Sequence, residues 1–264
     1  YSMFGFQRFG DLAWAAGDMR CKGFLLGATA GRTTLAGEGL QHQDGNSHLL
    51  AYTIPNVVAY DPAFAYELAV IIRDGIYRMY EKQENVYYYI TIMNENYAQP
   101  EMPKGVKDGI LKGMYKFKTS GVKDQKVKAH LLGSGTILNE VIKAQEILEN
   151  KYNVSADIWS VTSYKNLHLD AQEAERWNMF HPDKEAKVPY VSQATKGESG
   201  VFISASDYVQ LSSDAISKWL PGPLHSLGTF GFGRSEGRTS LRDFFEVDAK
   251  HIVVSHFFLF WVIY

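Results

Sequence analysis

Short strand-like runs alternate with longer helix-like stretches along the chain, and this alternation constrains the fold more than any other feature. The expected buried strands are rich in apolar, β-branched or aromatic residues and lie at residues 23–28, 86–92, 127–133 and 156–161. The expected helices lie at residues 7–22, 63–80 and 137–152, and the second of these begins at the helix-start signal Asp61-Pro62. The pattern is typical of an α/β protein with a mainly parallel sheet.

Residues 100–126 separate two such α/β units, because they carry prolines, glycines and many lysines with little apolar periodicity. We expect a linker there, with its lysines on a solvated face, and divide the chain into units 1–122 and 123–264. Residues 251–256 read as a short strand, followed by eight apolar residues, too few to span a bilayer, which needs about twenty. From about residue 255 we expect a non-native tail, with a fully buried terminal strand as the alternative.

Composition bounds the class of protein. The chain of 264 residues is 45% hydrophobic and 21% charged, which is typical of a globular protein with ample core. A formal net charge of −2 argues against nucleic acid as a partner, since phosphate binding usually needs a basic excess. The single cysteine, Cys21, excludes a disulfide within these residues and is expected to be a packed thiol in a reducing compartment. No signal segment opens the sequence, which reads as though it begins mid-protein.

The loop of residues 37–48 concentrates titratable side chains between glycines that let the backbone turn sharply. It carries Glu38, His42, Asp44 and His48. A histidine titrates near neutral pH and can pass a proton or hydrogen-bond a developing oxyanion, and a nearby glutamate raises its pKa or fixes its tautomer. We therefore interpret Glu38 and His42 as an acid–base pair, with His48 as a further candidate. For each imidazole a satisfied structural role is the alternative.

Other motifs narrow the chemistry by exclusion. Residues 27–33 have the wrong spacing for a phosphate-binding P-loop, and Arg32 stands where its lysine should be. The chain has no CxxC, HExxH or EF-hand pattern, so we predict no metal site built by this chain; we also expect no serine hydrolase. A metal held by His42, Asp44 and His48 is the alternative, which no second cluster at a recognisable spacing supports.

Two further glycine-rich segments stand between expected elements. The turn Gly133-Ser134-Gly135 could cradle an anion on its backbone N–H groups, but it lacks the third glycine of the dinucleotide fingerprint. We expect a tight structural turn there. Residues 226–237 form the second glycine-rich loop, to which the residue pattern assigns no role.

Several longer segments fall in the order of one known family. They are Tyr1–Arg8, Gly31–Leu35, Gly37–His48, Thr53–Asn56, Lys82–Ile90, Glu175–Met179 and Phe245–Asp248. On these segments the chain resembles the homodimeric bacterial-type pyruvate dehydrogenase, the thiamine-diphosphate-dependent, decarboxylating first component of the pyruvate dehydrogenase complex. The resemblance implies a transketolase-like fold. Residues 1–122 would form the later half of the pyrimidine-binding domain, and residues 123–264 the C-terminal α/β domain, whose family role is structural and includes subunit association.

The resemblance also implies roles for single residues. Phe4 corresponds to the aromatic residue that packs against the aminopyrimidine ring of thiamine diphosphate, and Tyr1 and His42 line the pyruvate pocket. Glu38 corresponds to a carboxylate close to that pocket, and His42 is expected to hydrogen-bond the reacting substrate. Arg8 matches a family position to which we assign no role beyond a structural ion pair.

For the whole protein the resemblance implies a cytoplasmic homodimer that uses thiamine diphosphate and Mg²⁺. It would decarboxylate pyruvate oxidatively and reductively acetylate the lipoyl domain of dihydrolipoyl acetyltransferase. Neither nucleic acid nor a membrane is an expected partner. Two alternatives stay open: a stand-alone, non-catalytic dimerisation or binding module, and a relative that acts on another 2-oxo acid.

Departures from the family pattern limit what this chain is expected to do alone. Phe230 replaces an aspartate in the family's Gly-Thr-Asp-Gly-Phe-Gly loop, and Asn46 stands where a histidine is usual. The Gly-Asp-Gly signature that binds Mg²⁺ and diphosphate is absent from this sequence, as is the glutamate that activates the aminopyrimidine. We therefore expect the Mg²⁺ ligands to lie outside this chain, and the isolated chain to be inactive.

Overall fold

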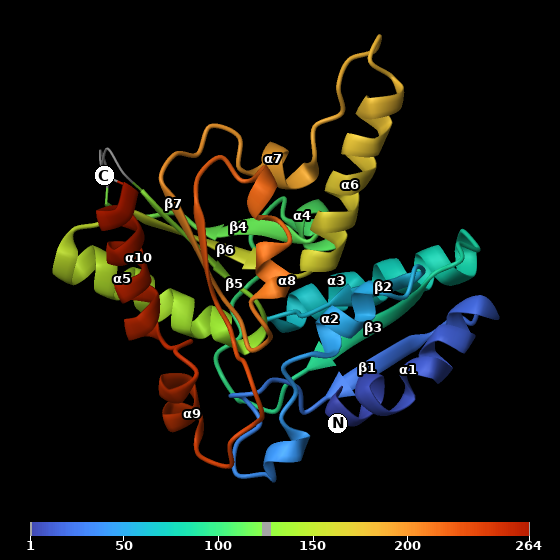
Figure 1. Ribbon diagram of the computed structural model, residues 1–264, viewed down its shortest axis with the longest axis horizontal. Coiled ribbons are helices and arrows are strands. Elements are labelled where there is room, and N and C mark those ends of the chain that lie inside the picture. The colour runs from blue at the N-terminus through green and yellow to red at the C-terminus, as the bar shows by residue number, and fades with distance from the viewer. Residues whose placement is uncertain (1, 123–127, 264) are drawn as a thin grey trace.

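Two α/β units, each built around its own sheet, form the computed structural model, which describes residues 2–122 and 128–263 (Figure 1). The first unit runs through α1 (Ser2–Asp18), β1 (Phe24–Ala28), η1 (Leu40–His42), α2 (Ser47–Tyr52), β2 (Val57–Tyr60), α3 (Ala65–Ile76), η2 (Tyr77–Glu81) and β3 (Tyr87–Ile92). The second runs through α4 (Lys107–Lys112), β4 (Met114–Lys118), β5 (Ala129–Gly133), η3 (Gly135–Ile137), α5 (Leu138–Tyr152), β6 (Ala156–Val161), α6 (Tyr164–Phe180), α7 (Tyr190–Ala194), β7 (Val201–Ala205), α8 (Leu211–Asp214), η4 (Ser217–Trp219), β8 (Leu224–Leu227), α9 (Arg238–Phe244) and α10 (Ala249–Ile263).

Parallel pairing dominates both sheets. The first sheet has the order β1-β3-β2 with both pairs parallel. The second has the order β4-β6-β5-β7-β8, in which only β4 runs antiparallel to its neighbour. The predicted α/β class with a mainly parallel sheet is confirmed, as are the strands expected near residues 23–28, 86–92, 127–133 and 156–161.

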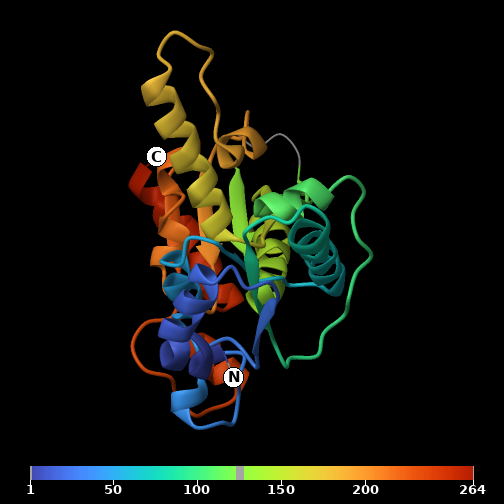
Figure 2. The same ribbon diagram turned by 90° about the vertical axis from the view of Figure 1, so that its right-hand side faces the viewer.

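Helices cover both faces of the second sheet, and its strands alternate side chains between them. Leu131, Ile158 and Ile203 point to one core, which α5 and α10 close. Residues one position further along, such as Leu132 and Trp159, point to the other core, beneath α6 and α7. A strand buried on both faces reads as a continuous apolar run, which is why the sequence reveals these strands. Figure 2 shows α6 and the loop after it extending away from the sheet.

Glu67 joins the two units at the start of α3. Its carboxylate accepts the N–H groups of Ala63 (2.6 Å) and Phe64 (3.1 Å), which are unpaired at the beginning of a helix. The other oxygen accepts the hydroxyls of Tyr115 on β4 and Ser160 on β6, each at 2.6 Å. The side chain is fully buried, and burial raises its pKa. One carboxyl group therefore caps a helix of the first unit and fixes it to the second sheet.

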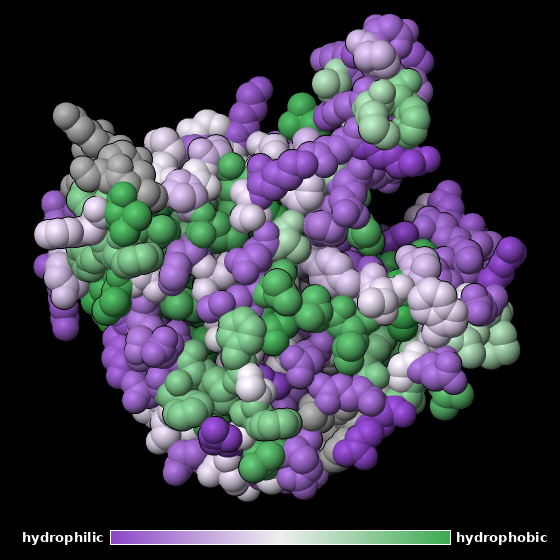
Figure 3. Space-filling view, in the orientation of Figure 1, coloured by the Kyte–Doolittle hydropathy of each residue, from purple (hydrophilic) through white to green (hydrophobic). Residues whose placement is uncertain are grey.

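The expected strand at residues 251–256 is wrong, because this segment lies in helix α10. Ile252, Ser255, His256 and Leu259 are buried and recur at helical spacing, and Ile252 and Leu259 belong to the core that α5 and α10 close. The run is apolar almost throughout, so the sequence lacks the polar contrast that would reveal this period. Exposed apolar side chains of α10 lie near the left edge of the space-filling view (Figure 3). The non-native origin of the residues from about 255 stays a prediction.

The expected linker at residues 100–126 is wrong for its central part. Helix α4 and strand β4 occupy residues 107–112 and 114–118, and β4 forms the edge of the second sheet. Ile110 and Met114 are fully buried there. Lys116 also departs from the expected solvated face, since its ammonium group lies 2.8 Å from the buried carboxylate of Asp157.

The expectation for Cys21 is wrong, whereas the one for the turn at residues 133–135 is confirmed. Cys21 is exposed, so the expected packed thiol is wrong; the cysteine lies between α1 and β1. The turn at residues 133–135 is tight, as expected: Gly135 has a φ of +50°, and a Cβ atom there would lie 2.8 Å from the carboxylate of Asp61. No helix within the described residues has the length and apolar character needed to cross a membrane.

Replacing Glu67 by alanine should lower the free energy of unfolding by about 3–5 kcal/mol, because two hydroxyls and two N–H groups would lose a charged acceptor in the core. Urea unfolding of the 264-residue chain measures this change. Glu173→Ala, on the exposed side of α6, is the matched control and should change stability by less than about 0.5 kcal/mol. Equal effects of the two substitutions would contradict the role assigned to Glu67.

Candidate functional site

The loop that carries the titratable residues follows the carboxyl end of β1 and lies beside the second unit (Figure 1). Carboxyl ends of parallel strands are where α/β folds place their binding residues. Its first turn is fixed by Asp207, which follows β7 of the second unit. One carboxylate oxygen of Asp207 accepts the N–H (2.9 Å) and hydroxyl (2.5 Å) of Thr33, and the other accepts the hydroxyl of Thr34. Gly31 has a φ of +92°, and a Cβ atom there would collide with the same carboxylate.

Arg32 is buried at the start of the loop. Only 2% of its surface is exposed, and burial lowers its pKa while the charges of Asp44 and Asp207 act in the opposite direction. The guanidinium donates to the carbonyl of Thr229 (3.3 Å) and packs on the backbone of Gly45, where a Cβ atom would lie 2.5 Å from its central carbon. The arginine therefore holds both ends of the loop to the second unit.

Glu38 and His42 meet at the accessible side of this loop. Nδ1 of His42 lies 3.3 Å from Oε2 of Glu38, one helical turn away in the sequence. The side chain of His42 is 21% exposed and that of Glu38 42%, so a small molecule can reach the pair. The carboxylate fixes the orientation of the ring and favours the tautomer with a proton on Nδ1. The structure thus brings together the two residues that the sequence pattern singled out.

His48 faces inward, apart from that pair. Its Nε2 lies 3.0 Å from the hydroxyl oxygen of Thr91, and its ring meets Tyr208 edge-on at 4.6 Å. Burial lowers the pKa of His48 to about 4, so the imidazole is neutral at pH 7. Asp44, in turn, accepts the N–H groups of Asn46 (2.9 Å) and Ser47 (3.0 Å) at the start of α2. Both residues serve the inner structure of the loop.

A second titratable group, Asp61, adjoins His48 through Thr91. The hydroxyl oxygen of Thr91 lies 2.6 Å from Oδ1 of Asp61 and 3.0 Å from Nε2 of His48, so it links the two groups in one hydrogen-bonded chain. Burial raises the pKa of Asp61 to about 7. A closed cavity of about 20 Å³, room for one water molecule, adjoins His48 and Asp61. The inner part of the site therefore holds a neutral imidazole and a carboxyl group that titrates near neutral pH.

Potential metal ligands gather elsewhere. Among the described residues, three such side chains lie within reach of one ion at only two places: His130 with Asp157 and Glu198, and Asp243 with Asp248 and His251. Neither set includes His42, Asp44 or His48. The first is already occupied by cations, because the ammonium groups of two lysines lie 2.8 Å and 2.6 Å from Asp157.

For three of the residues highlighted by the resemblance, the structure does not test the expected role. Tyr1 lies outside the described residues, and of Phe4 only the backbone, in α1, is described. Arg8 is exposed on the same helix. The roles expected for Tyr1, Phe4 and Arg8 therefore stay predictions, as do the catalytic roles of Glu38 and His42.

Sequence reasoning missed the residues of the second unit that support the loop. Asp207 lies 174 positions from Thr33, and nothing in its neighbourhood marks it as a partner. The glycine-rich loop of residues 226–237 was visible as a motif, and it too contacts the site: the hydroxyl of Ser235 donates to the carbonyl of Glu38 (2.7 Å). Phe230, which replaces the family's aspartate, is exposed in that loop.

Two family models match consecutive parts of the chain. Residues 1–100 match the middle domain of the pyruvate dehydrogenase E1 component, and residues 113–248 match the transketolase-like C-terminal domain. The chain belongs to the pyruvate dehydrogenase E1 family. Its transketolase-like fold is thereby confirmed.

Curated relatives carry the same name. The chain is 55% identical over 259 residues to the pyruvate dehydrogenase E1 component of Pseudomonas aeruginosa, and 54% identical over 257 residues to that of Escherichia coli K12. Each match covers 97% of this chain, which spans 29% and 28% of the two relatives.

Solved transketolases share the fold at low identity. Transketolase from Campylobacter jejuni superposes with a TM-score of 0.70 at 15% identity, over 96% of this chain and 34% of that one. A chain of an inactive split-gene transketolase tetramer gives 0.61 at 12% identity, over 96% of this chain and 72% of that one.

The opposite pKa shifts of His48 and Asp61 predict how the stability of the chain depends on pH. His48 has a pKa near 4 in the folded chain against 6.5 unfolded, and Asp61 has one near 7 against 3.8. Between pH 4 and 6.5 the unfolded chain carries the proton on His48 and the folded chain carries it on Asp61. Folding then moves one proton within the pair, and the two pH dependences cancel.

Single substitutions should expose each half of this balance. In Asp61→Asn only His48 remains, so the unfolded chain binds more protons and stability should rise from pH 4 to 6.5. In His48→Gln only Asp61 remains, and stability should fall over the same window. Each change should amount to about 3 kcal/mol across the window, measured by urea unfolding at several pH values. Slopes of the same sign in the two variants would contradict the pairing.

Proposed function

We propose that this chain supplies the substrate-facing half of the active site of a thiamine-diphosphate-dependent pyruvate dehydrogenase. The whole protein would decarboxylate pyruvate oxidatively and acetylate the lipoyl group of its partner acyltransferase, as a cytoplasmic homodimer. The observation that carries the proposal is the accessible Glu38–His42 pair on a loop held at both ends. The names of relatives at 54–55% identity support the same reaction.

The residues present fit part of the cofactor's needs. Thiamine diphosphate, when bound, supplies a nucleophilic carbon and an electron sink for the loss of carbon dioxide. An imidazole that is one-fifth exposed and oriented by a carboxylate suits the substrate side of such a site. The ring of Phe6 packs edge-on against Tyr89 at 4.4 Å, which fixes α1 against the first sheet. We assign the aminopyrimidine contact to Phe4 of that helix, and a place in the pyruvate pocket to Tyr1.

Diphosphate and Mg²⁺ are assigned to residues outside this chain. Mg²⁺ prefers carboxylate and water oxygens in octahedral geometry. The two clusters of potential ligands in the described part of the second unit are an ion-paired group around Asp157 and a half-exposed group around Asp248, whose neighbour Lys250 is paired with Asp243. Neither has a free set of oxygens for a metal-bound diphosphate.

His42 performs the chemistry expected of this chain. Glu38 accepts a hydrogen bond from Nδ1 and so fixes the orientation of the ring. When the ring is protonated, Nε2 can donate to the oxygen of pyruvate on which negative charge develops, or pass a proton to it. In the buried His48–Thr91–Asp61 chain the imidazole is neutral, and burial raises the pKa of Asp61 to about 7. The raised pKa of Asp61 reduces the negative charge that an anionic substrate such as pyruvate meets from this inner layer.

In the full-length enzyme, His42→Ala should lower kcat for pyruvate decarboxylation by about 10²–10⁴-fold, because the proton donor is lost. His42→Gln should lose less, since an amide still donates a hydrogen bond although it cannot titrate. Steady-state rates with an artificial electron acceptor measure both. His181→Ala, whose ring stacks on Trp177 after α6, is the control and should keep full activity. Full activity of His42→Ala would refute the assigned role.

The isolated 264-residue chain should neither bind thiamine diphosphate stably nor consume pyruvate, because the diphosphate and Mg²⁺ sites lie elsewhere. Isothermal titration with thiamine diphosphate and Mg²⁺, followed by a pyruvate-consumption assay, tests this. Turnover by the chain alone would refute the assignment of those sites. The alternative result is that the chain folds stably and binds no cofactor, in a source that produces only this chain and no longer form of the protein. That result would favour the non-catalytic binding module.

A further inference from the structure

One short segment of the second unit contacts the part of the loop that carries Glu38 and His42. Residues 233–238, which we call the clamp, include the end of the connection from β8 and the first residue of α9, and they run beside residues 34–43 of the first unit, near the bottom of Figures 1 and 2. In the family this unit is expected to be structural. The contacts of the clamp assign it a more specific task.

The clamp binds three backbone positions that lead up to Glu38. Arg238 donates from Nε to the carbonyl of Thr34 (2.7 Å), and the N–H of Gly37 donates to the carbonyl of Glu236 (3.2 Å). Ser235 donates its hydroxyl to the carbonyl of Glu38 itself (2.7 Å). These contacts fix the backbone before and at Glu38, from which its carboxylate reaches His42.

A buried glutamine extends the clamp to the other side of the loop. Gln43, fully buried next to His42, accepts the N–H of Arg234 (2.6 Å) and donates to the carbonyl of Leu35 (2.8 Å). Gly233 lies so close that a Cβ atom there would collide with the carbonyl of Leu40 and come within 2.6 Å of the side-chain oxygen of Gln43. The close approach requires glycine at this position.

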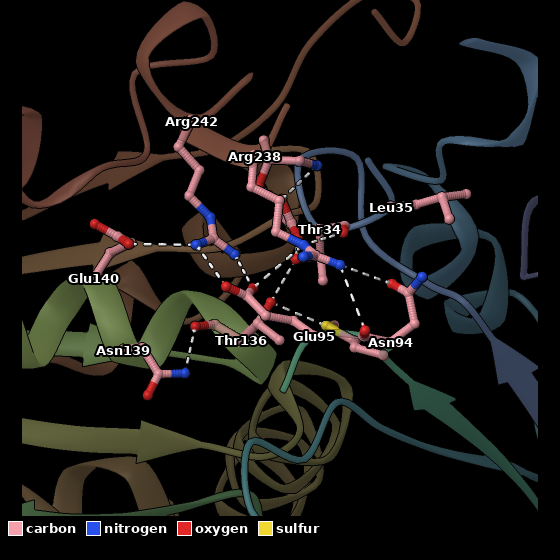
Figure 4. Close-up of polar contacts among 12 residues, drawn as sticks. Thr34, Leu35, Asn94, Glu95, Thr136, Asn139, Glu140, Arg238 and Arg242 are labelled. Atoms are coloured by element: carbon pink, nitrogen blue, oxygen red, sulfur yellow. Dashed lines mark hydrogen bonds and ion pairs between the residues drawn. The ribbon is translucent and has the colours of Figure 1, made fainter. Parts of the chain in front are cut away.

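Two arginines of α9 anchor the clamp to residues after β3 and at the start of α5. Figure 4 shows Arg238 and Arg242 of α9 reaching toward residues that follow β3. Arg238 donates to Asn94 (3.4 Å), and Arg242 forms a two-pronged pair with the carboxylate of Glu95. Arg242 also lies 3.4 Å from Glu140 at the start of α5. Bidentate arginine pairs fix direction as well as distance. The clamp is therefore held by both units.

We propose that residues 233–238 act as a positioning clamp for the Glu38–His42 pair, so that catalysis depends on the second unit through the hydroxyl of Ser235 and the close approach of Gly233. The inference rests on the catalytic role proposed for His42. Ser235 is exposed, and its hydroxyl makes one contact with the loop, at the residue that orients the imidazole. Small displacements of a catalytic group can reduce rates by up to about 10²-fold.

Four substitutions, one of them a control, separate positioning from folding in the full-length enzyme. Ser235→Ala should lower kcat for pyruvate by about 10-fold, with thermal stability and KM little changed, because only the orientation of Glu38 is lost. Ser235→Thr keeps the hydroxyl and should restore most of the rate. Ser240→Ala, an exposed serine on α9, is the matched control and should have no effect. Gly233→Ala, whose methyl group presses on Leu40, should lower kcat in the same direction as Ser235→Ala.

A second readout on the 264-residue chain is independent of turnover. The ¹⁵N chemical shifts of the His42 ring report which nitrogen carries the proton, and Ser235→Ala should change a single tautomer into a mixture. This result would support the clamp even if the enzyme proved not to act on pyruvate. Unchanged ring shifts in Ser235→Ala would overturn the proposal. A loss of kcat that follows a loss of thermal stability, without rescue by threonine, would also overturn it.

Discussion

The carboxylate of Asp207 is the contact on which the site depends. It is buried at the end of β7, and it accepts three hydrogen bonds from Thr33 and Thr34 of the other unit. A buried carboxylate without donors is very costly, so the loop cannot leave this position without exposing or orphaning the charge. This turn fixes the position from which the segment from Leu35 to His42 begins. It also restricts the backbone conformations of the loop's glycines, which would otherwise make the loop mobile.

Charge balance completes the anchoring. The buried charge of Arg32 is favoured by the charges of Asp44 and Asp207, whose carboxylates are themselves hydrogen-bonded to N–H or hydroxyl groups. Burying one of these three charges without the other two would be strongly unfavourable, whereas the three are tolerated together. The polar contacts that couple the two units therefore stabilise the structure only when all of them are present. Glu67 also joins the two units. Its carboxylate accepts hydrogen bonds from four donors: two N–H groups just before α3 and the hydroxyls of residues on β4 and β6.

What the sequence predicted, and what it did not, follows from the range of each interaction. Strands such as β3 and β5 were predicted because an apolar run between breakers is a local signal. Glu38 and His42 are one helical turn apart, so their meeting was also a local matter. Helix α10 was missed because its uniform apolar run carries no period. Asp207 was missed because a single aspartate, distant in sequence from its partners, carries no mark of the fold that brings them together.

The two layers of the site differ in how far their titratable groups are buried, and the fold explains why. In the inner layer, burial keeps His48 neutral at neutral pH and raises the pKa of Asp61 to about 7, so only about half of the Asp61 carboxyl groups are ionised there. In the outer layer, the side chains of Glu38 and His42 are partly exposed and can contact a bound molecule. An anionic substrate would be repelled by a buried, ionised carboxylate close behind its pocket. The raised pKa of Asp61 reduces that repulsion, and thus links the packing of the two units to the chemistry proposed for His42.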